Sequence, residues 1–316
     1  MSTMVALIRR EWQEHRVGLG WSPVAILAVL ALITIMALAA ASFGEVNVTM
    51  DGSEGSHRFH EEVEISGLSS LAHFLELDQW SDAELEENLA KFRSLVATPF
   101  KAVYFLIAVF ILVSALHDDR RDRSVLFWKS MPVSDAETVL SKLVTVVWVA
   151  PVVVIAGIVA AQLFLLTVIS TLTLVEDVGG AGRLWWHSGL LVGTLELVVG
   201  YVIQGFWALP VYAWLLAVSA AAPRLPILWA VLLPVVPAIA ERMVFGTDAV
   251  SDFVRAHLEF AALPAAISED DGRIAPAIGL AEQLSLVFSL QMWLGIIVGG
   301  LLLWLAVYFR NRNNDL

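Results

Sequence analysis

The chain has 316 residues, of which 58% are hydrophobic and 16% charged, and its mean hydropathy is +0.76. A soluble domain of this size does not need so much apolar surface, so the composition excludes an ordinary soluble protein and indicates a polytopic membrane protein. The net charge of −12 does not suggest nucleic-acid binding, and the absence of cysteine excludes disulfides and cysteine-based metal or nucleophile chemistry.

Six apolar stretches are long enough to cross a bilayer as helices, which takes about 20 residues each. We expect an all-α fold with spans at residues 21–43, 99–116, 143–175, 190–222, 225–245 and 290–309. The third and fourth stretches are too short for two spans and a turn, so each is predicted to be one long or tilted helix. The first exceeds a signal-peptide core of roughly 7–15 residues and follows a polar segment, which favours an uncleaved span.

Lysine and arginine gather on one side of the predicted spans. More than half of the 19 basic residues lie in four short segments, residues 1–20, 117–142, 223–224 and 310–316. This side and both termini are therefore predicted to be cytoplasmic, in a bacterial inner (plasma) membrane. The other connections, residues 44–98, 176–189 and 246–289, are predicted to be external. The two long ones, 44–98 and 246–289, are strongly acidic.

Helical periodicity also occurs outside the spans. Residues 4–19 combine Trp12 with arginine in an amphipathic pattern, which predicts a helix lying in the cytoplasmic interface. In the first external loop, Ser81 and Glu84 form a capping box before apolar residues at helical spacing, and a similar pattern begins at Ile65. We expect two amphipathic helices here, forming a small external cap.

The sequence contains no recognisable catalytic set. No glycine-rich phosphate loop precedes any lysine, and the spans carry no bis-histidine haem pair and no protease arrangement. His57 and His60, beside two glutamates, could ligate a metal, but two histidines without further ligands are weak support for a site. The chain is therefore predicted not to be an enzyme, with no metal and no cofactor of its own.

One face of the fourth span is polar and rich in small residues. Its members follow the period of an α-helix and are Gly189, Gly193, Glu196, Gly200, Gln204 and Trp207. A charged or amide side chain at membrane depth normally faces protein or water rather than lipid. Two interpretations stay open: Glu196 and Gln204 line a translocation pathway, or the face is a helix interface in which the glutamate is locally hydrogen-bonded.

The last two spans carry glycine and proline signals. Gly295 and Gly299 give the sixth span a close-packing pattern of the same kind. Pro226, Pro234 and Pro237 lie in the fifth span, and because proline removes a helix hydrogen bond, this span is predicted to be kinked or broken.

The cytoplasmic loop at residues 117–142 is both charged and aromatic. Residues 119–131 can form a short helix that Pro132 ends, and Ser134 with Glu137 makes a second capping box where the helix of the third span begins. The loop has more apolar residues than one membrane-facing stripe requires. This favours a protein-docking surface over a simple interfacial loop.

These features resemble the permease subunit of an ATP-binding-cassette exporter of the ABC type-2 class. The resemblance is carried by the amphipathic N-terminal helix, by six spans with both ends inside, and by the segment DRSVLFWKSMPVSDAETVLSKL. After the coupling helix, family members commonly have the motif Leu/Met-Pro-Val/Ile-Ser and, shortly afterwards, a lysine. The matching residues here are Met131, Pro132, Val133, Ser134 and Lys142. Family loops often carry a glutamate and a glycine before the coupling helix, whereas this loop has aspartates and no glycine.

The resemblance implies an assembly of two permeases, as a homodimer or a related heterodimer, with two cytoplasmic ATPase subunits that bind ATP and Mg²⁺. The missing phosphate loop agrees with that division of labour. The ATPase-coupling residues would be Arg120, Arg123, Phe127, Trp128, Lys129, Met131 and Pro132. Within the lipid-embedded part, the pathway or helix-interface residues would be Gly193, Glu196, Gly200, Gln204 and Trp207.

A second interpretation is a non-transporting membrane scaffold or sensor whose acidic external cap binds a partner protein. An intramembrane enzyme fits less well, because no catalytic set is visible. Neither the cap nor the fourth span indicates which substrate an exporter of this kind would carry.

Overall fold

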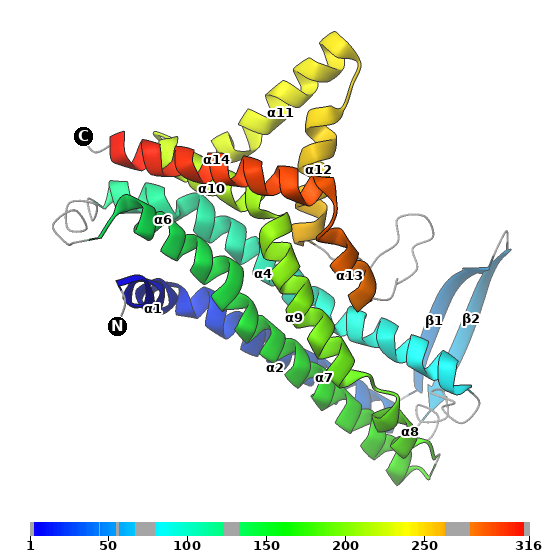
Figure 1. Cartoon of the computed structure of the whole chain (residues 1–316). Coiled ribbons are helices and arrows are strands. Elements are labelled where there is room, and N and C mark those ends of the chain that lie inside the picture. Colours follow the sequence, from blue (N-terminus) through cyan, green and yellow to red (C-terminus); the bar gives the residue numbers. More distant parts are fainter. Residues whose placement is uncertain are drawn as a thin grey trace.

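The protein is an elongated bundle of helices in which both chain termini lie at the same end (Figure 1). The computed structural model describes residues 3–43, 45–54, 57–66, 80–122, 133–177, 179–262 and 279–312. We call the end that carries the termini the terminal end, and the opposite end the far end.

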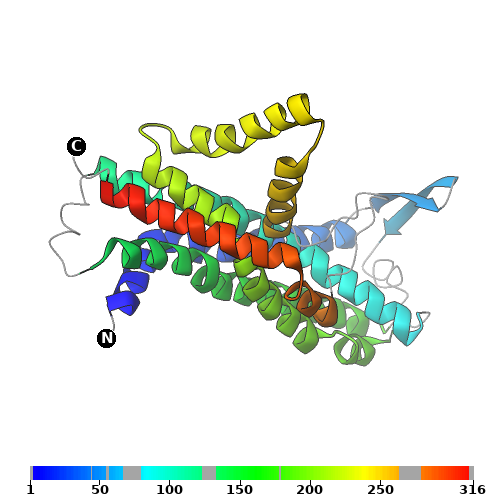
Figure 2. The ribbon, with the colours of Figure 1, turned by 45° about the horizontal axis from the view of Figure 1, so that its top comes forward.

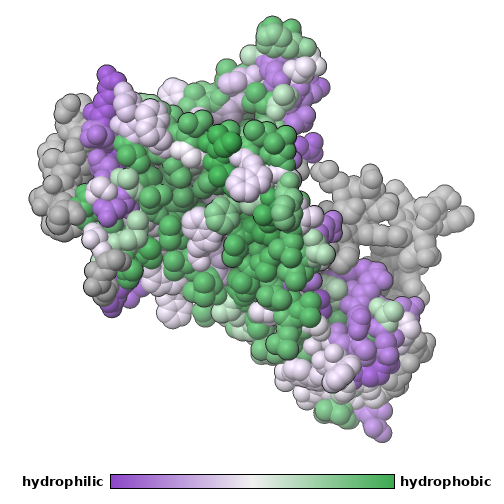
Figure 3. All heavy atoms as spheres, in the orientation of Figure 1, coloured by the Kyte–Doolittle hydropathy of each residue, from purple (hydrophilic) through white to green (hydrophobic). Residues whose placement is uncertain are grey.

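Six helical stretches in these ranges are long and apolar enough to cross a membrane: Thr3–Ser42, Asp82–Arg121, Asp135–Val175, Ala181–Trp207, Pro226–Phe245 and Leu290–Arg312. A broad hydrophobic surface covers the middle of the molecule between hydrophilic patches towards its ends (Figure 3). This is the composition of a surface that faces lipid, so the predicted class, a polytopic helical membrane protein, is confirmed at this level.

The N-terminal segment is a bent helical arm. Helix α1 (Thr3–His15) leads through a short π-helical turn (Arg16–Gly20) into α2 (Trp21–Phe43). The two helices lie at an angle to each other (Figures 1 and 2). The predicted N-terminal helix is thus present, and its buried residues are Leu7 and Glu11.

A two-stranded antiparallel hairpin follows α2, formed by β1 (Glu45–Glu54) and β2 (His57–Ser66), with Glu45 opposite Ser66. This corrects the all-α expectation, because residues 57–66 alternate apolar and polar side chains in the manner of a strand. Ile65, the start of the first predicted cap helix, lies in β2. The remainder of that predicted helix falls outside the described residues.

The second predicted cap helix and the second span are one helix, α4 (Asp82–Arg121). The capping box is confirmed: the Ser81 hydroxyl accepts from the Glu84 N–H at 3.3 Å, and the Glu84 carboxylate accepts from the Ser81 N–H at 2.8 Å. The predicted boundary at residue 99 is absent, and Pro99 lies inside the helix. Hydropathy marks where a helix enters lipid, but it does not end the helix.

The third span is also longer than predicted. Helix α6 (Asp135–Val144), a π-helical turn (Thr145–Val149) and α7 (Ala150–Val175) follow one another without a break. The second capping box, Ser134 with Glu137, is confirmed as the start of α6. The ring of Pro151 has no N–H to offer the preceding turn, and the Tyr104 hydroxyl donates to the Val146 carbonyl there at 2.9 Å.

The fourth predicted span is two helices rather than one. After the short helix α8 (Ala181–Trp186), α9 (Leu190–Trp207) and α10 (Leu209–Ala221) are separated at Ala208. The prediction of a single helix over residues 190–222 was therefore wrong. The reason is Pro210, which lacks an N–H and whose ring crowds the carbonyl of the preceding turn.

The fifth span, α11 (Pro226–Phe245), was predicted to be kinked or broken; it is one continuous helix, so the break is absent. Pro226 occupies the first turn, where its missing N–H costs nothing. Pro234 deprives the Ala230 carbonyl of its helical donor, and the indole N–H of Trp214 on α10 donates to that same carbonyl at 3.0 Å. A neighbouring side chain thus replaces the lost backbone bond.

The predicted loop at residues 246–289 contains two further helices, α12 (Ala249–Ala262) and α13 (Leu280–Leu286), before α14 (Leu290–Arg312). Figures 1 and 2 show α12 returning from the tip of α11 towards the bundle. His257 on α12 is 1% exposed and lies beside Gly295, where an added Cβ would be 2.6 Å from the imidazole Nε2. Gly295, predicted to be a close-packing residue, therefore packs against α12 of the same chain.

Two hydrophobic clusters hold the bundle together. The main cluster joins α4, α7, α10 and α14 and includes Leu112, Ile158, Tyr212, Leu216 and Ala306, each at most 1% exposed. A smaller cluster at the far end consists of Leu85, Leu89, Leu166 and Leu184. There Arg183 donates to the Trp80 carbonyl and to Asp82, both at 2.8 Å, and so fastens α8 to the start of α4.

Candidate functional site

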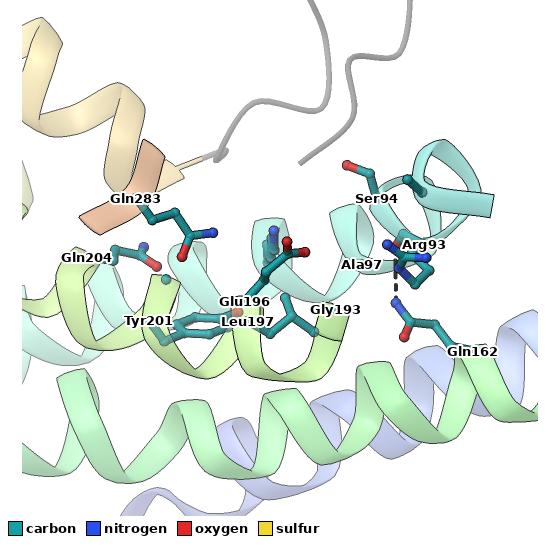
Figure 4. A pocket seen from close by; sticks show the side chains of 13 residues that line it. Arg93, Ser94, Ala97, Gln162, Gly193, Glu196, Leu197, Tyr201, Gln204 and Gln283 are labelled. Carbon is teal, nitrogen blue, oxygen red and sulfur yellow. Dashed lines mark hydrogen bonds between the residues drawn. The ribbon is translucent and has the colours of Figure 1, made fainter. Parts of the chain in front are cut away.

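A cavity of about 150 Å³ lies between α4, α7, α9 and α13. Figure 4 shows polar side chains converging on it from these helices. The lining residues are Ala90, Arg93, Ser94, Ala97 and Lys101 of α4, Gln162 of α7, Gly193, Glu196, Leu197, Gly200, Tyr201 and Gln204 of α9, and Gln283 of α13.

The wall contributed by α9 is the face that the sequence singled out. Four of the five candidate pathway residues line the cavity, namely Gly193, Glu196, Gly200 and Gln204. The fifth, Trp207, lies about one turn further along, and its indole N–H donates to the Ala256 carbonyl of α12 at 3.1 Å. Trp207 therefore joins two helices, whereas the other four face a polar space.

Arg93 lies across the start of α9. Its Nη1 donates to the Ser188 carbonyl at 2.6 Å. An added Cβ at Gly193 would be 2.8 Å from the Arg93 Nε, so a larger residue at this position would have to displace the guanidinium. Gln162 of α7 donates its amide Nε2 to the Arg93 backbone carbonyl at 3.2 Å, which ties a third helix to the same point (Figure 4).

Lys101 is the second cation of the cavity. Within the described ranges its ammonium group makes no hydrogen bond or ion pair, whereas Arg93 bonds to Ser188 and interacts electrostatically with Glu196. The hydroxyls of Ser94 and Tyr201 are buried and find no partner in the same described part of the chain. The cavity thus combines one unmatched positive charge with unused hydrogen-bonding groups.

The sequence interpretation missed the α4 side of this cavity. Residues 90, 93, 97 and 101 recur at helical spacing, but the first three fell in the predicted external loop. Lys101 was the available signal, because a lysine just inside a predicted span normally faces protein or a polar cavity.

A second polar assembly, which we call the terminal ion cluster, joins four helices at the terminal end. It consists of Glu11 on α1, Asp119 on α4, Asp135 and Lys142 on α6, and Arg310 on α14. The Lys142 Nζ lies 3.3 Å from Glu11 and 3.5 Å from Asp119. The side chains of Glu11 and Lys142 are each 2% exposed, so these charges are matched inside the protein.

Arg310 closes the terminal ion cluster. Its Nη1 donates to Asp119 at 3.1 Å and its Nε donates to Asp135 at 2.9 Å. Asp119 and Asp135 stand on either side of residues 123–132, so one guanidinium holds both flanks of the segment that was predicted to dock an ATPase. Three acids against two bases leave the five-residue cluster with a formal charge of −1.

The predicted coupling residues are only partly within the described chain. Arg120 is half-buried, and its Nη2 donates to the carbonyls of Ser219 and Ala222 at 2.9 and 2.8 Å, which anchors the C-terminal end of α10 to α4. The other coupling candidates lie outside the described residues: Arg123, Phe127, Trp128, Lys129, Met131 and Pro132.

The metal-site candidates His57 and His60 lie on β2. In the portion whose side chains are described, no three histidine or acidic side chains come close enough together to hold a metal ion.

Comparison with protein-family models, with curated proteins and with solved structures finds no match.

Proposed function

We propose that this chain is the membrane-spanning permease subunit of an ATP-driven exporter of the ABC type-2 class. The observation that carries the proposal is the Arg310 clamp, in which one buried guanidinium bonds to Asp119 and Asp135, which lie on either side of residues 123–132 in the sequence. A loop that receives force from another protein needs flanks that move together with the spans.

The terminal ion cluster supplies that connection. Through Glu11, Lys142 and Arg310, displacement of the loop flanks is shared by α1, α4, α6 and α14. Hydrogen bonds between charged groups in a buried setting are strong and directional, so the four helix ends behave as one body. This arrangement suits a protein whose energy source is a separate ATPase that binds ATP and Mg²⁺ at the terminal end.

The cavity supports a translocation role for the α9 face. A helix interface alone would bring apolar or mutually bonded residues together, whereas Glu196 and Lys101 border a space that holds further polar groups. In this proposal the cavity is part of the pathway, and the permease pairs with a second copy or a related chain to complete it.

The proposal places the terminal end in the cytoplasm of a bacterial cell. The absence of cysteine makes this directly testable, because single cysteines can be introduced without background labelling. Glu87→Cys, on the exposed far part of α4, should react with a membrane-impermeant maleimide added outside spheroplasts. Arg312→Cys should react only after permeabilisation. The opposite labelling pattern would show that the terminal end is outside the cell.

The docking assignment is tested by co-purification with the ATP-binding-cassette ATPase encoded nearest to this chain. The double variant Arg123→Glu, Trp128→Ala should retain at least tenfold less ATPase than the unmodified chain. A matched control, Lys91→Glu with Trp186→Ala, makes the same kinds of change at the far end and should retain all of it. Equal retention by both variants would refute the docking surface, and a wild-type chain that binds no such ATPase would favour the scaffold interpretation.

A further inference from the structure

The cavity between α4 and α9 has an excess of positive charge. Arg93 and Lys101 contribute two cations and Glu196 one anion, so the formal charge of the lining is +1. Arg93 interacts electrostatically with Glu196 and bonds to the Ser188 carbonyl, which leaves Lys101 as the cation that no described side chain neutralises. An ammonium group held in a partly buried site is stabilised by an anion that comes to it.

The position of Lys101 along α4 places the cavity near one face of the membrane. Lys101 is 18 residues before Asp119 on the same helix, which corresponds to about 27 Å at 1.5 Å per residue. The hydrocarbon layer is about 30 Å thick, so if Asp119 lies at one boundary, Lys101 lies close to the other. Lipid headgroups occupy that depth.

The size of the cavity limits what enters it. Its volume of about 150 Å³ is well below the roughly 300–1,000 Å³ of sites that enclose drug-sized ligands. It can therefore hold the polar group of an amphiphile while the apolar remainder stays outside in the lipid. Buried hydroxyls at Ser94 and Tyr201 offer hydrogen bonds that the described residues do not use.

We propose that this cavity binds the singly charged anionic group of an amphiphile, a phosphate- or carboxylate-type headgroup, through an ion pair with Lys101. Ser94 and Tyr201 donate hydrogen bonds to its oxygens, and the negative charge of Glu196 excludes ligands of higher negative charge. That such an amphiphile is the class of molecule transported rests on the proposed exporter function. The binding step itself requires only this chain.

The test is a titration of the purified full-length chain with short-chain lipids, followed by intrinsic tryptophan fluorescence. Dihexanoyl phosphatidylglycerol, which is anionic, should bind at least tenfold more tightly than zwitterionic dihexanoyl phosphatidylcholine. Lys101→Gln should remove this preference. Lys91→Gln is the matched control, because Lys91 lies on the same helix, outside the cavity, and pairs with Glu87 at 2.7 Å.

A second variant tests the charge balance without removing the cation. Glu196→Gln raises the formal charge of the lining from +1 to +2 and should tighten phosphatidylglycerol binding several-fold. Competition by acetate, a singly charged free anion, identifies the source of the anion: displacement of the lipid assigns the ion pair to a free anion, and no displacement assigns it to a headgroup. Unchanged binding by Lys101→Gln, or equal affinity of the wild type for the two lipids, overturns the proposal.

The titration is independent of any ATPase. If the lipid preference is absent but the ATPase still co-purifies, the anion site is wrong and the permease proposal stands. If the ATPase does not bind but the lipid preference depends on Lys101, the anion site stands and the exporter function fails.

Discussion

Replacing Lys142 by methionine is the most direct test of the terminal ion cluster. The Lys142 side chain is 2% exposed, and its ammonium group stands between Glu11 at 3.3 Å and Asp119 at 3.5 Å. Methionine keeps much of the volume and removes the charge. The formal charge of the cluster then changes from −1 to −2, and Glu11 loses its nearest cation.

The expected cost follows from these distances. At 3.3 Å and an effective dielectric constant of about 20, the Coulomb attraction between Lys142 and Glu11 is roughly 5 kcal/mol before desolvation is counted. Removing one partner of a buried pair typically costs about 3–5 kcal/mol, and we expect Lys142→Met to lower the free energy of unfolding by that amount. Adding Glu11→Gln returns the cluster charge to −1 and should recover about 2 kcal/mol.

Equilibrium unfolding in mixed micelles of a nonionic detergent and dodecyl sulfate, followed through the 12 tryptophans, measures these differences. Lys91→Met is the control, because the exposed Lys91–Glu87 pair should contribute about 1 kcal/mol or less. The reasoning is refuted if Lys142→Met costs no more than this control, or if the double variant costs the sum of the two single changes.

Two further predictions concern helix packing. Trp214→Phe leaves the Ala230 carbonyl without its donor and should lower the free energy of unfolding by about 1–3 kcal/mol. In a Pro234→Ala background the helix supplies its own N–H to this carbonyl, so the same change should cost clearly less. Equal costs in both backgrounds would contradict the donor role of Trp214. Gly295→Ala places a methyl group against the α12 imidazole and should destabilise by about 1–3 kcal/mol. Gly300→Ala on the same helix meets nothing within 4 Å and should be neutral or slightly stabilising in the same assay, and identical effects of the two alanines would argue against the close approach.

Features encoded locally were predictable from the sequence. Both capping boxes, at Ser81 and Ser134, were found because the two partners are three residues apart and the chemistry is complete within one turn. The α9 face was found because a polar stripe with a period of 3.6 residues is visible in a single helix. The number of long apolar helices followed from hydropathy, although their ends did not.

Features that depend on distant partners were not predictable. Whether a proline breaks its helix depends on such partners: Pro210 separates α9 from α10, whereas Pro234 leaves α11 intact because Trp214, 20 residues earlier, replaces the lost bond. Arg93 and Lys101 acquire their place in the cavity only when α4 meets α9. In the sequence, Arg310 has the position of an ordinary cation flanking a membrane span. Its role depends on Asp135 and Asp119, which are 175 and 191 residues away.

The sequence separation between the members of the terminal ion cluster determines when during synthesis the cluster can form. Translation produces Glu11 first, Asp119, Asp135 and Lys142 much later, and Arg310 last of the five cluster residues. Until α14 has been inserted, Asp119 is paired with Lys142 but not yet with Arg310, and Asp135 lacks its Arg310 partner, so the helices of the terminal end are not yet all joined. A ribosome product cut short before residue 310 would leave Asp135 without its Arg310 partner and would be open to the quality-control proteases of the membrane. Insertion of α14 therefore completes the ion pairs that join α1, α4 and α6 at the terminal end.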